Sequence, residues 1–263
     1  MIKKIISQLK IFFQLIKTDL IIFKKDALGG IIDTIIWVSI LLFVTSHLYP
    51  KLGMPLNYGV IYLLGTIVSC SLFETESNVV SIISDIEGNN NISYQATLPI
   101  KSNFVFLKNA ISSACKAMTL AIVIIPLGKI FLWQRLNLSL FSPIKFLIMF
   151  VTIGIFAGIF SIFMSSLVKG MKQIDIVWFR VLFPLWMLGG TFFPWYAVYK
   201  LSPKFAYLFL LNPVIYASEG MRVAILGQQN YINFWLCLSA MWFSVFIFGF
   251  FGIKRLKKRL DFI

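Results

Sequence analysis

The chain has 263 residues, of which 59% are hydrophobic and 13% charged, with a mean hydropathy of +0.87 and a formal net charge of +14. Soluble domains have about 45–50% apolar and about 25% charged residues, so this composition excludes a soluble globular domain. Since a membrane-spanning helix needs about 20 apolar residues, the chain has room for about six spans and no sizeable soluble domain. We therefore predict an all-α membrane protein that acts in or across a bilayer.

The positive charge does not indicate a nucleic-acid partner. Basic residues cluster at the ends of apolar segments and in alternate loops, whereas the aromatic residues lie inside the apolar runs. This distribution is typical of membrane topology and not of a basic binding face with interleaved aromatics. No nucleic-acid partner is expected.

The few soft ligands of the chain do not form a metal site. Cys70, Cys115 and Cys237 lie in apolar or weakly polar runs without CxxC spacing, and His47 is the single histidine. Zinc normally takes at least three ligands from His, Cys or carboxylate side chains. We predict small buried hydrophobes for the cysteines, an interfacial polar residue for His47, and no metal.

Residues 1–28 have the pattern of an amphipathic helix. Apolar residues recur every three or four positions, and Lys3, Lys10, Lys17 and Lys24 recur every seven along the flank of that stripe. Such lysines can snorkel to lipid phosphates. We predict an interfacial helix lying on the membrane, with a first span as the alternative. No small-residue cleavage site follows, so we expect the segment to be retained rather than removed as a signal peptide.

Six spans follow a predicted break at Gly29-Gly30. The apolar runs cover residues 31–49, 58–80, 109–127, 144–168, 176–193 and 232–253. Residues 50–55 form a Pro/Gly-rich turn, and residues 81–101 contain the longest hydrophilic interruption.

A further apolar stretch, residues 205–226, is interrupted by Asn212-Pro213 and contains Glu219 and Arg222. With six spans, both termini share one side with most of the basic residues, and the positive-inside rule places that side in the cytoplasm. A seventh span would put the basic C-terminal cluster outside. We therefore predict that residues 195–227 form an outer re-entrant hairpin, which is tolerated where protein or water covers the broken backbone.

Several local motifs occur in a characteristic order. They are Leu188-Gly189-Gly190-Thr191-Phe192-Phe193-Pro194, Leu211-Asn212-Pro213-Val214-Ile215-Tyr216, Glu219-Gly220-Met221-Arg222, Leu226-Gly227, and Tyr94-Gln95-Ala96-Thr97-Leu98-Pro99. With the basic amphipathic helix, six spans and the hairpin before the last span, this order resembles type-2 ABC exporter permeases. The short loops are similar to those of permeases that export capsular polysaccharide, O-antigen, teichoic acid or Nod-factor-like glycolipids.

The resemblance implies partners, energy source and location. The sequence has no GxxxxGK[ST] phosphate loop, so ATP and Mg²⁺ would be bound by a separate ABC ATPase subunit, and no cofactor by this chain. The resemblance implies two ATPase copies, a second copy of this chain, and a multi-pass location in the bacterial inner membrane, in contact with its lipids. The expected cargo is a lipid-linked polysaccharide or related amphiphile, with drugs, antibiotics or lipids as alternatives.

The resemblance also assigns the polar segment after the second span. Residues 84–99 would be the coupling helix that docks on the ATPase, with Asp85 and Glu87 pairing with its basic residues. Tyr94, Gln95, Leu98 and Pro99 would complete that contact. A plain solvated loop is the alternative.

Glu219 and Arg222 lie three residues apart, which allows an ion pair on one helical face of the hairpin begun by Asn212-Pro213. Pairing lowers the free energy needed to place either charge near the bilayer. Two roles are open: the pair holds the hairpin's shape, or it contacts cargo directly.

Aromatic residues are dense between residues 178 and 216. Aromatic rings stack on the C–H faces of sugars, so some of them could line a path for a glycan; the alternative is an interfacial belt. The candidate path residues are Phe183, Trp186, Phe192, Phe193, Trp195, Tyr196 and Tyr216.

Two rival classes of function are also open. In a secondary transporter or channel, Asp33, Glu74 and Glu76 would carry a coupling ion, but the two halves of the sequence show no internal repeat. A membrane-embedded enzyme needs a cluster of His, Asp or Glu at one depth, and the acids here are scattered.

Overall fold

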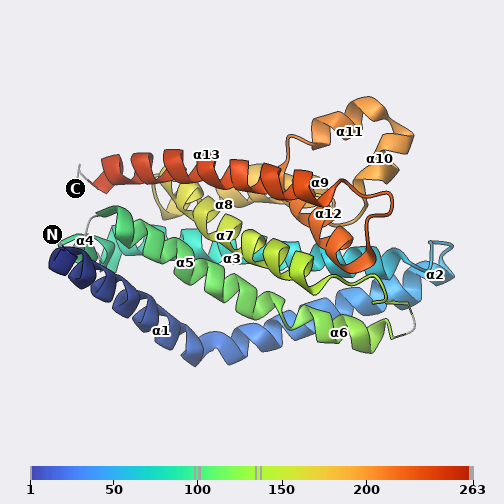
Figure 1. Cartoon of the computed structure of the whole chain (residues 1–263), viewed down its shortest axis with the longest axis horizontal. Coiled ribbons are helices and arrows are strands. Elements are labelled where there is room, and N and C mark those ends of the chain that lie inside the picture. The colour runs from blue at the N-terminus through green and yellow to red at the C-terminus, as the bar shows by residue number, and fades with distance from the viewer. Residues whose placement is uncertain are drawn as a thin grey trace.

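The computed structural model describes residues 2–89, 91–97, 99, 102–133, 135–136 and 138–260. Every described element is helical, and the long helices run along one axis (Figure 1). Both termini and α4 (Asn91–Thr97) lie at one end, which we call the terminal end. Helices α2 (Tyr49–Lys51), α10 (Trp195–Leu201) and α11 (Pro203–Phe209) lie at the opposite, distal end. The protein is therefore all-α, as the composition predicts.

Five helical stretches of the described chain are long and apolar enough to cross a membrane: Gln8–Lys51, Tyr58–Gly88, Asn103–Phe131, Pro143–Leu167 and Phe234–Arg259. Their elements are α1 (Ile2–Phe43) with η1 (Val44–Leu48) and α2, α3 (Tyr58–Ser84) with η2 (Asp85–Asn89), α5 (Ser102–Ala121) with α6 (Ile124–Phe131), α7 (Pro143–Leu167) and α13 (Phe234–Leu260). The protein is thus a multi-pass membrane protein by length and composition of its helices.

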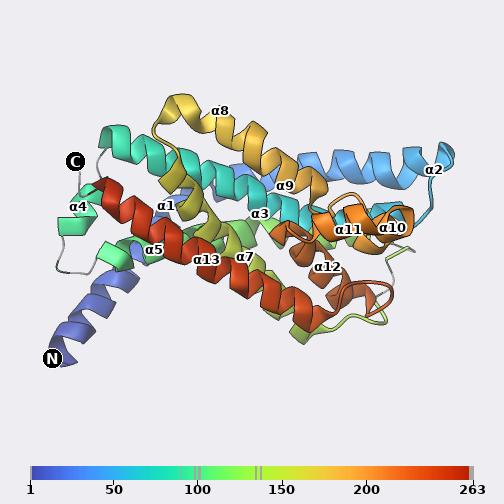
Figure 2. The same cartoon turned by 90° about the horizontal axis from the view of Figure 1, so that it is seen from above.

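The predicted break at Gly29-Gly30 is wrong, because α1 runs through both glycines without interruption. A glycine inside a helix costs only about 1 kcal/mol relative to alanine, so packing can override it. A Cβ on Gly30 would lie 3.2 Å from a methyl carbon of Leu120 on α5, so this glycine serves close helix contact. Figure 2 shows the N-terminal arm of α1 projecting away from the other helices.

The predicted span 176–193 is not among the five stretches. It is divided into α8 (Ile174–Val177), the π-helical η4 (Trp178–Leu182) and α9 (Phe183–Leu188), after the short η3 (Met171–Gln173). Pro184 lies in the first turn of α9. Because it has no backbone N–H, it removes one hydrogen bond to the preceding helical turn. Whether this segment crosses the membrane as a sixth span stays a prediction.

Helix α7 lies at the centre and packs against α13, α5, α3 and α12 (Pro213–Leu226). Small residues bring α5 and α7 together: a Cβ on Gly158 would lie 2.0 Å from the carbonyl oxygen of Ala110. Against α13 the contact is aromatic, with the rings of Phe163 and Phe248 4.8 Å apart. This arrangement is typical of membrane bundles, where small residues permit close backbone approach.

Candidate functional site

Asp85 organises the polar segment at the terminal end. Its two carboxylate oxygens accept hydrogen bonds from the backbone N–H groups of Asn91 (3.1 Å) and Ile92 (2.8 Å), the first residues of α4. A carboxylate at a helix N-terminus satisfies free donors and complements the helix dipole. Asp85 therefore caps α4 within the chain, and its pairing with a basic residue of the ATPase stays a prediction.

Glu87 joins this segment to the next connection at the same end. Both carboxylate oxygens accept from the N–H of Met171 at 3.3 Å. The carboxylate of Glu87 also lies against the backbone of the neighbouring Gly170, whose lack of a side chain leaves room for it. The stretches before α4 and before α8 are thus held together.

The other predicted coupling residues are placed differently from one another. Tyr94 is 68% exposed on α4, and Pro99 is exposed as well. Gln95 is half-buried, and its Oε1 has no hydrogen-bond partner among the described residues. Leu98 lies outside the described residues. Tyr94 is therefore the member of the set that α4 presents outward.

Helix α12 begins at the Asn212-Pro213 pair that the sequence analysis singles out. The side-chain oxygen of Asn212 accepts from the N–H of Val214 at 2.9 Å, and Pro213 occupies the first helical turn. Asn212 also donates from Nδ2 to the carbonyl of Leu185 on α9 at 2.8 Å. A cap and a proline are ordinary helix-start signals, and here the cap also attaches α12 to α9.

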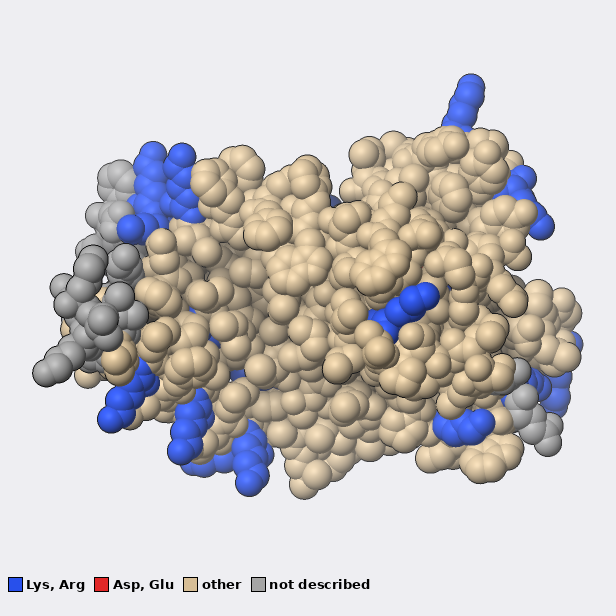
Figure 3. Space-filling model, viewed as in Figure 1, with Lys and Arg blue, Asp and Glu red and all other residues tan. Residues whose placement is uncertain are grey.

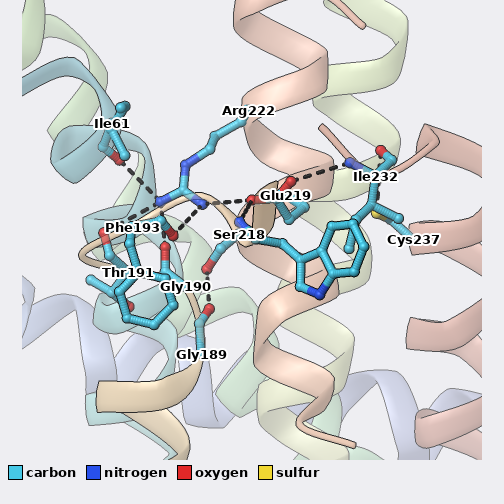
Figure 4. A network of polar contacts seen from close by, with 11 residues as sticks. Ile61, Gly189, Gly190, Thr191, Phe193, Ser218, Glu219, Arg222, Ile232 and Cys237 are labelled. Carbon is cyan, nitrogen blue, oxygen red and sulfur yellow. Dashed lines mark hydrogen bonds and ion pairs between the residues drawn. The ribbon is translucent and has the colours of Figure 1, made fainter. Parts of the chain in front are cut away.

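Arg222 on α12 is fully buried and lies at the centre of a polar network (Figure 4). Its Nη1 lies 3.0 Å from Oε1 of Glu219, which forms the ion pair. The guanidinium donates further to four backbone carbonyls: Nη1 to Phe193 at 3.2 Å, and Nη2 to Ile61 at 3.3 Å, to Thr191 at 3.3 Å and to Gly190. One side chain therefore joins α3, the connection after α9, and α12.

Glu219 is equally buried and accepts two backbone hydrogen bonds besides the ion pair. Oε1 accepts from the N–H of Trp195, which begins α10, at 2.9 Å, and Oε2 from the N–H of Ile232, ahead of α13, at 3.2 Å. Buried charges need a partner and hydrogen bonds on their remaining atoms. Every nitrogen and oxygen of these two side chains has a partner except Nε of Arg222, which has none among the described residues. The contacts of both side chains are within the protein, which fits the shape-holding role rather than contact with cargo.

Close backbone packing around the network depends on glycines and a serine, of which the sequence analysis did not single out Gly65 and Ser218. A Cβ on Gly65 of α3 would lie 2.5 Å from the carbonyl oxygen of Thr191. Gly190 has a φ of +74°, which favours glycine, and Ser218 donates to the carbonyl of Gly189 at 2.8 Å. Of these glycines and the serine, Gly189 and Gly190 alone belong to a motif that the sequence analysis quotes, the one from Leu188 to Pro194.

The seven candidate path aromatics divide into separate groups. Phe183, Trp186 and Phe192 belong to a cluster along α3 and α9, in which the Trp186 indole N–H donates to Ser69 at 2.8 Å. Phe193, Trp195 and Tyr196 lie at the distal end: Phe193 contacts Phe209, Trp195 contacts Tyr199, and Tyr196 lies under Lys200. Tyr216 lies apart, half-buried on α12. The ring contacts within one chain do not connect all seven, and whether some of them line a path stays a prediction.

Two of the carboxylates proposed for ion coupling share a groove. Asp33 and Glu74 line a groove of about 410 Å³ between α1 and α3, together with Trp37 and Phe73. Glu76 does not line it. Among the described residues no group of three or more His, Cys, Asp or Glu could hold a metal ion.

These features define a polytopic α-helical membrane protein with a capped polar segment at its terminal end and a buried Arg–Glu network below its distal end. The family model of the ABC-2 type transporter matches residues 10–226, so the chain belongs to this family. It is a membrane permease subunit of an ABC transporter, and the family implies an ABC ATPase partner. A search of curated proteins finds no match.

Proposed function

We propose that this chain is the membrane subunit of an ABC exporter for a lipid-linked polysaccharide or related amphiphile, driven by ATP that a separate subunit hydrolyses. Two ATPases would bind two copies of this chain in the bacterial inner membrane, with the termini in the cytoplasm. ATP and Mg²⁺ would be bound by the partner and no cofactor by this chain. Exporters of drugs, antibiotics or lipids are the second candidate, since aromatic-rich helices also suit those cargoes.

The observation that carries the proposal is the braced segment formed by η2 and α4. Asp85 caps α4, Glu87 holds Met171, and Tyr94 points outward on a short helix between two long ones. A docking element needs to be exposed yet rigid, because a flexible loop would absorb a partner's movement. This geometry supports the coupling role over a plain solvated loop.

The contacts of α3 suggest how movement would pass along the bundle. At the terminal end Glu87 ties the end of α3 to Met171; in the middle Trp186 of α9 bonds to Ser69 of α3. Below the distal end Arg222 bonds to both Ile61 and Gly190. The helix formed by α3 and η2 is therefore linked at three levels to the stretch from η3 to the connection after α9, the third time through Arg222 of α12. A push on α4 would displace the two as one body.

Co-purification and ATP hydrolysis test the docking role. The tagged chain is co-expressed with each ABC ATPase of its genome, and the Tyr94→Ala variant is compared with Trp133→Ala, a 70% exposed aromatic at the distal end. We expect Tyr94→Ala to reduce both co-purification of the ATPase and its stimulated activity more than Trp133→Ala does, when the two are compared at equal amounts of folded protein. Equal behaviour of the two variants would contradict docking through α4.

Cysteine labelling tests the topology. Gln229 is exposed between α12 and α13, whereas Cys70 and Cys237 are buried, so a Gln229→Cys variant in a Cys115→Ala background has one accessible thiol. We expect an impermeant maleimide to label it from outside the cell. Labelling only after the cytoplasmic face is opened would refute the re-entrant hairpin.

A further inference from the structure

A cleft of about 490 Å³ opens at the distal end. Residues from four separate stretches line it: from residues 57–61 at the start of α3, Arg135, Ser139 and Leu140 between α6 and α7, from residues 194–200 of α10 and its approach, and from residues 226–231 between α12 and α13. The volume is in the range of small-molecule sites and is large enough for more than a single ion.

The buried network holds three of these four walls in place. Arg222 bonds to the carbonyls of Ile61 and Phe193, next to or within the first and third stretches. Glu219 accepts from the N–H groups of Trp195 and Ile232, so it fixes α10 and the stretch before α13. The cleft is therefore pre-formed, which lowers the ordering entropy that a ligand would otherwise lose on binding.

The charge of the cleft has one sign. Arg135 and Lys200 line it from different walls, and the four lining stretches contain no Asp or Glu in the sequence. The nearest acid, Glu219, is fully buried and paired with Arg222. Figure 3 shows Lys and Arg side chains at the distal end and no acidic surface on that face.

The hydrogen-bond donors of the cleft suit an anionic group attached to a molecule with hydroxyl groups. One Nη of Arg135 donates to the carbonyl of Ser46 at 2.5 Å, which orients the guanidinium; its other N–H groups have no hydrogen-bond partner among the described residues. The ammonium of Lys200 lies 4.8 Å from the ring centre of Tyr196. Burial raises the pKa of Tyr231, so its phenol is neutral and can donate. The amides of Asn57 and Asn230 add donors that suit hydroxyl groups.

We propose that this cleft binds a phosphate group carried on a small polyol or sugar. Arg135 would hold the phosphate oxygens through its fork of N–H donors, Lys200 would add a second charge, and the amides would contact the hydroxyl groups. The site goes beyond the proposed export function, because it is complete in one chain without the ATPase. Its ligand is either the head group of an anionic phospholipid or a phosphate-bearing part of the cargo.

Calorimetric titration of the purified full chain in detergent tests the site. The probes are dihexanoyl phosphatidylglycerol, sn-glycerol 3-phosphate and, as the zwitterionic control, dihexanoyl phosphatidylcholine. We expect saturable binding of at least one of the first two and none of the third. Arg135→Gln and Lys200→Gln should each raise the Kd about tenfold, since each removes a charge-assisted contact.

Lys204→Gln is the matched control, because Lys204 is an exposed distal cation on α11 that does not line the cleft. Its Kd should equal that of the unchanged protein. Arg135→Gln also removes the hydrogen bond to Ser46, so unfolding temperatures are measured to show whether this variant still folds. If it does not, Lys200→Gln alone tests the site. Binding of phosphatidylglycerol alone assigns the lipid head group, and binding of glycerol 3-phosphate as well assigns the phosphate-polyol unit of either source. Unchanged affinity in both cleft variants, or equal binding of phosphatidylcholine, would overturn the proposal.

Discussion

Replacing Arg222 with methionine tests whether the buried network holds the distal half of the protein together. The substitution keeps an unbranched side chain but removes the ion pair with Glu219 and the donors to four carbonyls. Glu219 keeps the N–H groups of Trp195 and Ile232 but remains a fully buried carboxylate without a counter-charge. Breaking a buried pair in this way destabilises a protein by about 3–5 kcal/mol.

The expected change is large enough to measure by thermal unfolding in detergent. At about 2–4 °C per kcal/mol for a chain of this size, Arg222→Met should lower the unfolding temperature by about 6–20 °C. The double variant Glu219→Leu, Arg222→Met carries no unpaired charge, so its loss should be smaller than the sum of the two single losses by at least about 1 kcal/mol. Hydrogen exchange should rise from Gly190 to Trp195 in the single variant.

Lys204→Met is the control, because it removes an exposed distal cation outside the network. An unfolding temperature of Arg222→Met equal to that of Lys204→Met, with no added exchange after α9, would refute the structural role of the pair. Arg222 would then have to be assigned to another function, such as contact with cargo.

Three further changes test other parts of the structure. Gly158→Ala places a Cβ 2.0 Å from the carbonyl oxygen of Ala110, so α5 and α7 must separate; we expect a loss of about 1–3 kcal/mol in unfolding free energy, and an unchanged value would contradict the packing. Asp85→Ala removes the cap of α4 and should cost about 1 kcal/mol locally, seen as faster hydrogen exchange in α4 only. Lys108→Met leaves Asp19, its partner at 2.8 Å, without a counter-charge between α5 and α1. It should therefore lower the unfolding temperature more than Lys108→Met combined with Asp19→Asn does.

Composition and local pattern are enough to predict much of this protein. Hydropathy places an apolar run in each of the five long apolar helical stretches, because each residue in lipid needs an apolar side chain whatever its neighbours are. It does not give their bounds: the run 31–49 lies in a stretch that extends from Gln8 to Lys51. The pairing of Glu219 with Arg222 follows from helical spacing alone, since residues three apart share a face. The order of motifs from residue 188 to residue 227 points to the family that the match over residues 10–226 shows.

Other predictions failed or stayed open because they depend on distant segments. Gly29-Gly30 has the local signal of a break, but the helix continues because Gly30 receives Leu120 of α5. The contact of Asp85 with an ATPase stays open: the structure shows its oxygens accepting from the N-terminus of α4, six and seven residues further along the chain, and the partner is a separate protein. A side chain's own sequence context does not reveal which neighbour reaches it.

The sequence by itself determined that lipid surrounds much of this protein, where its long apolar runs lie, and that its charge is distributed asymmetrically, because all of these are sums of local properties. What only the tertiary structure decided is the set of partners of Arg222 and the cleft beside them. The guanidinium binds backbone carbonyls, and every residue has a carbonyl, so no residue type marks Ile61, Gly190, Thr191 or Phe193 as its acceptors. Their meeting depends on how α3, α9 and α12 pack.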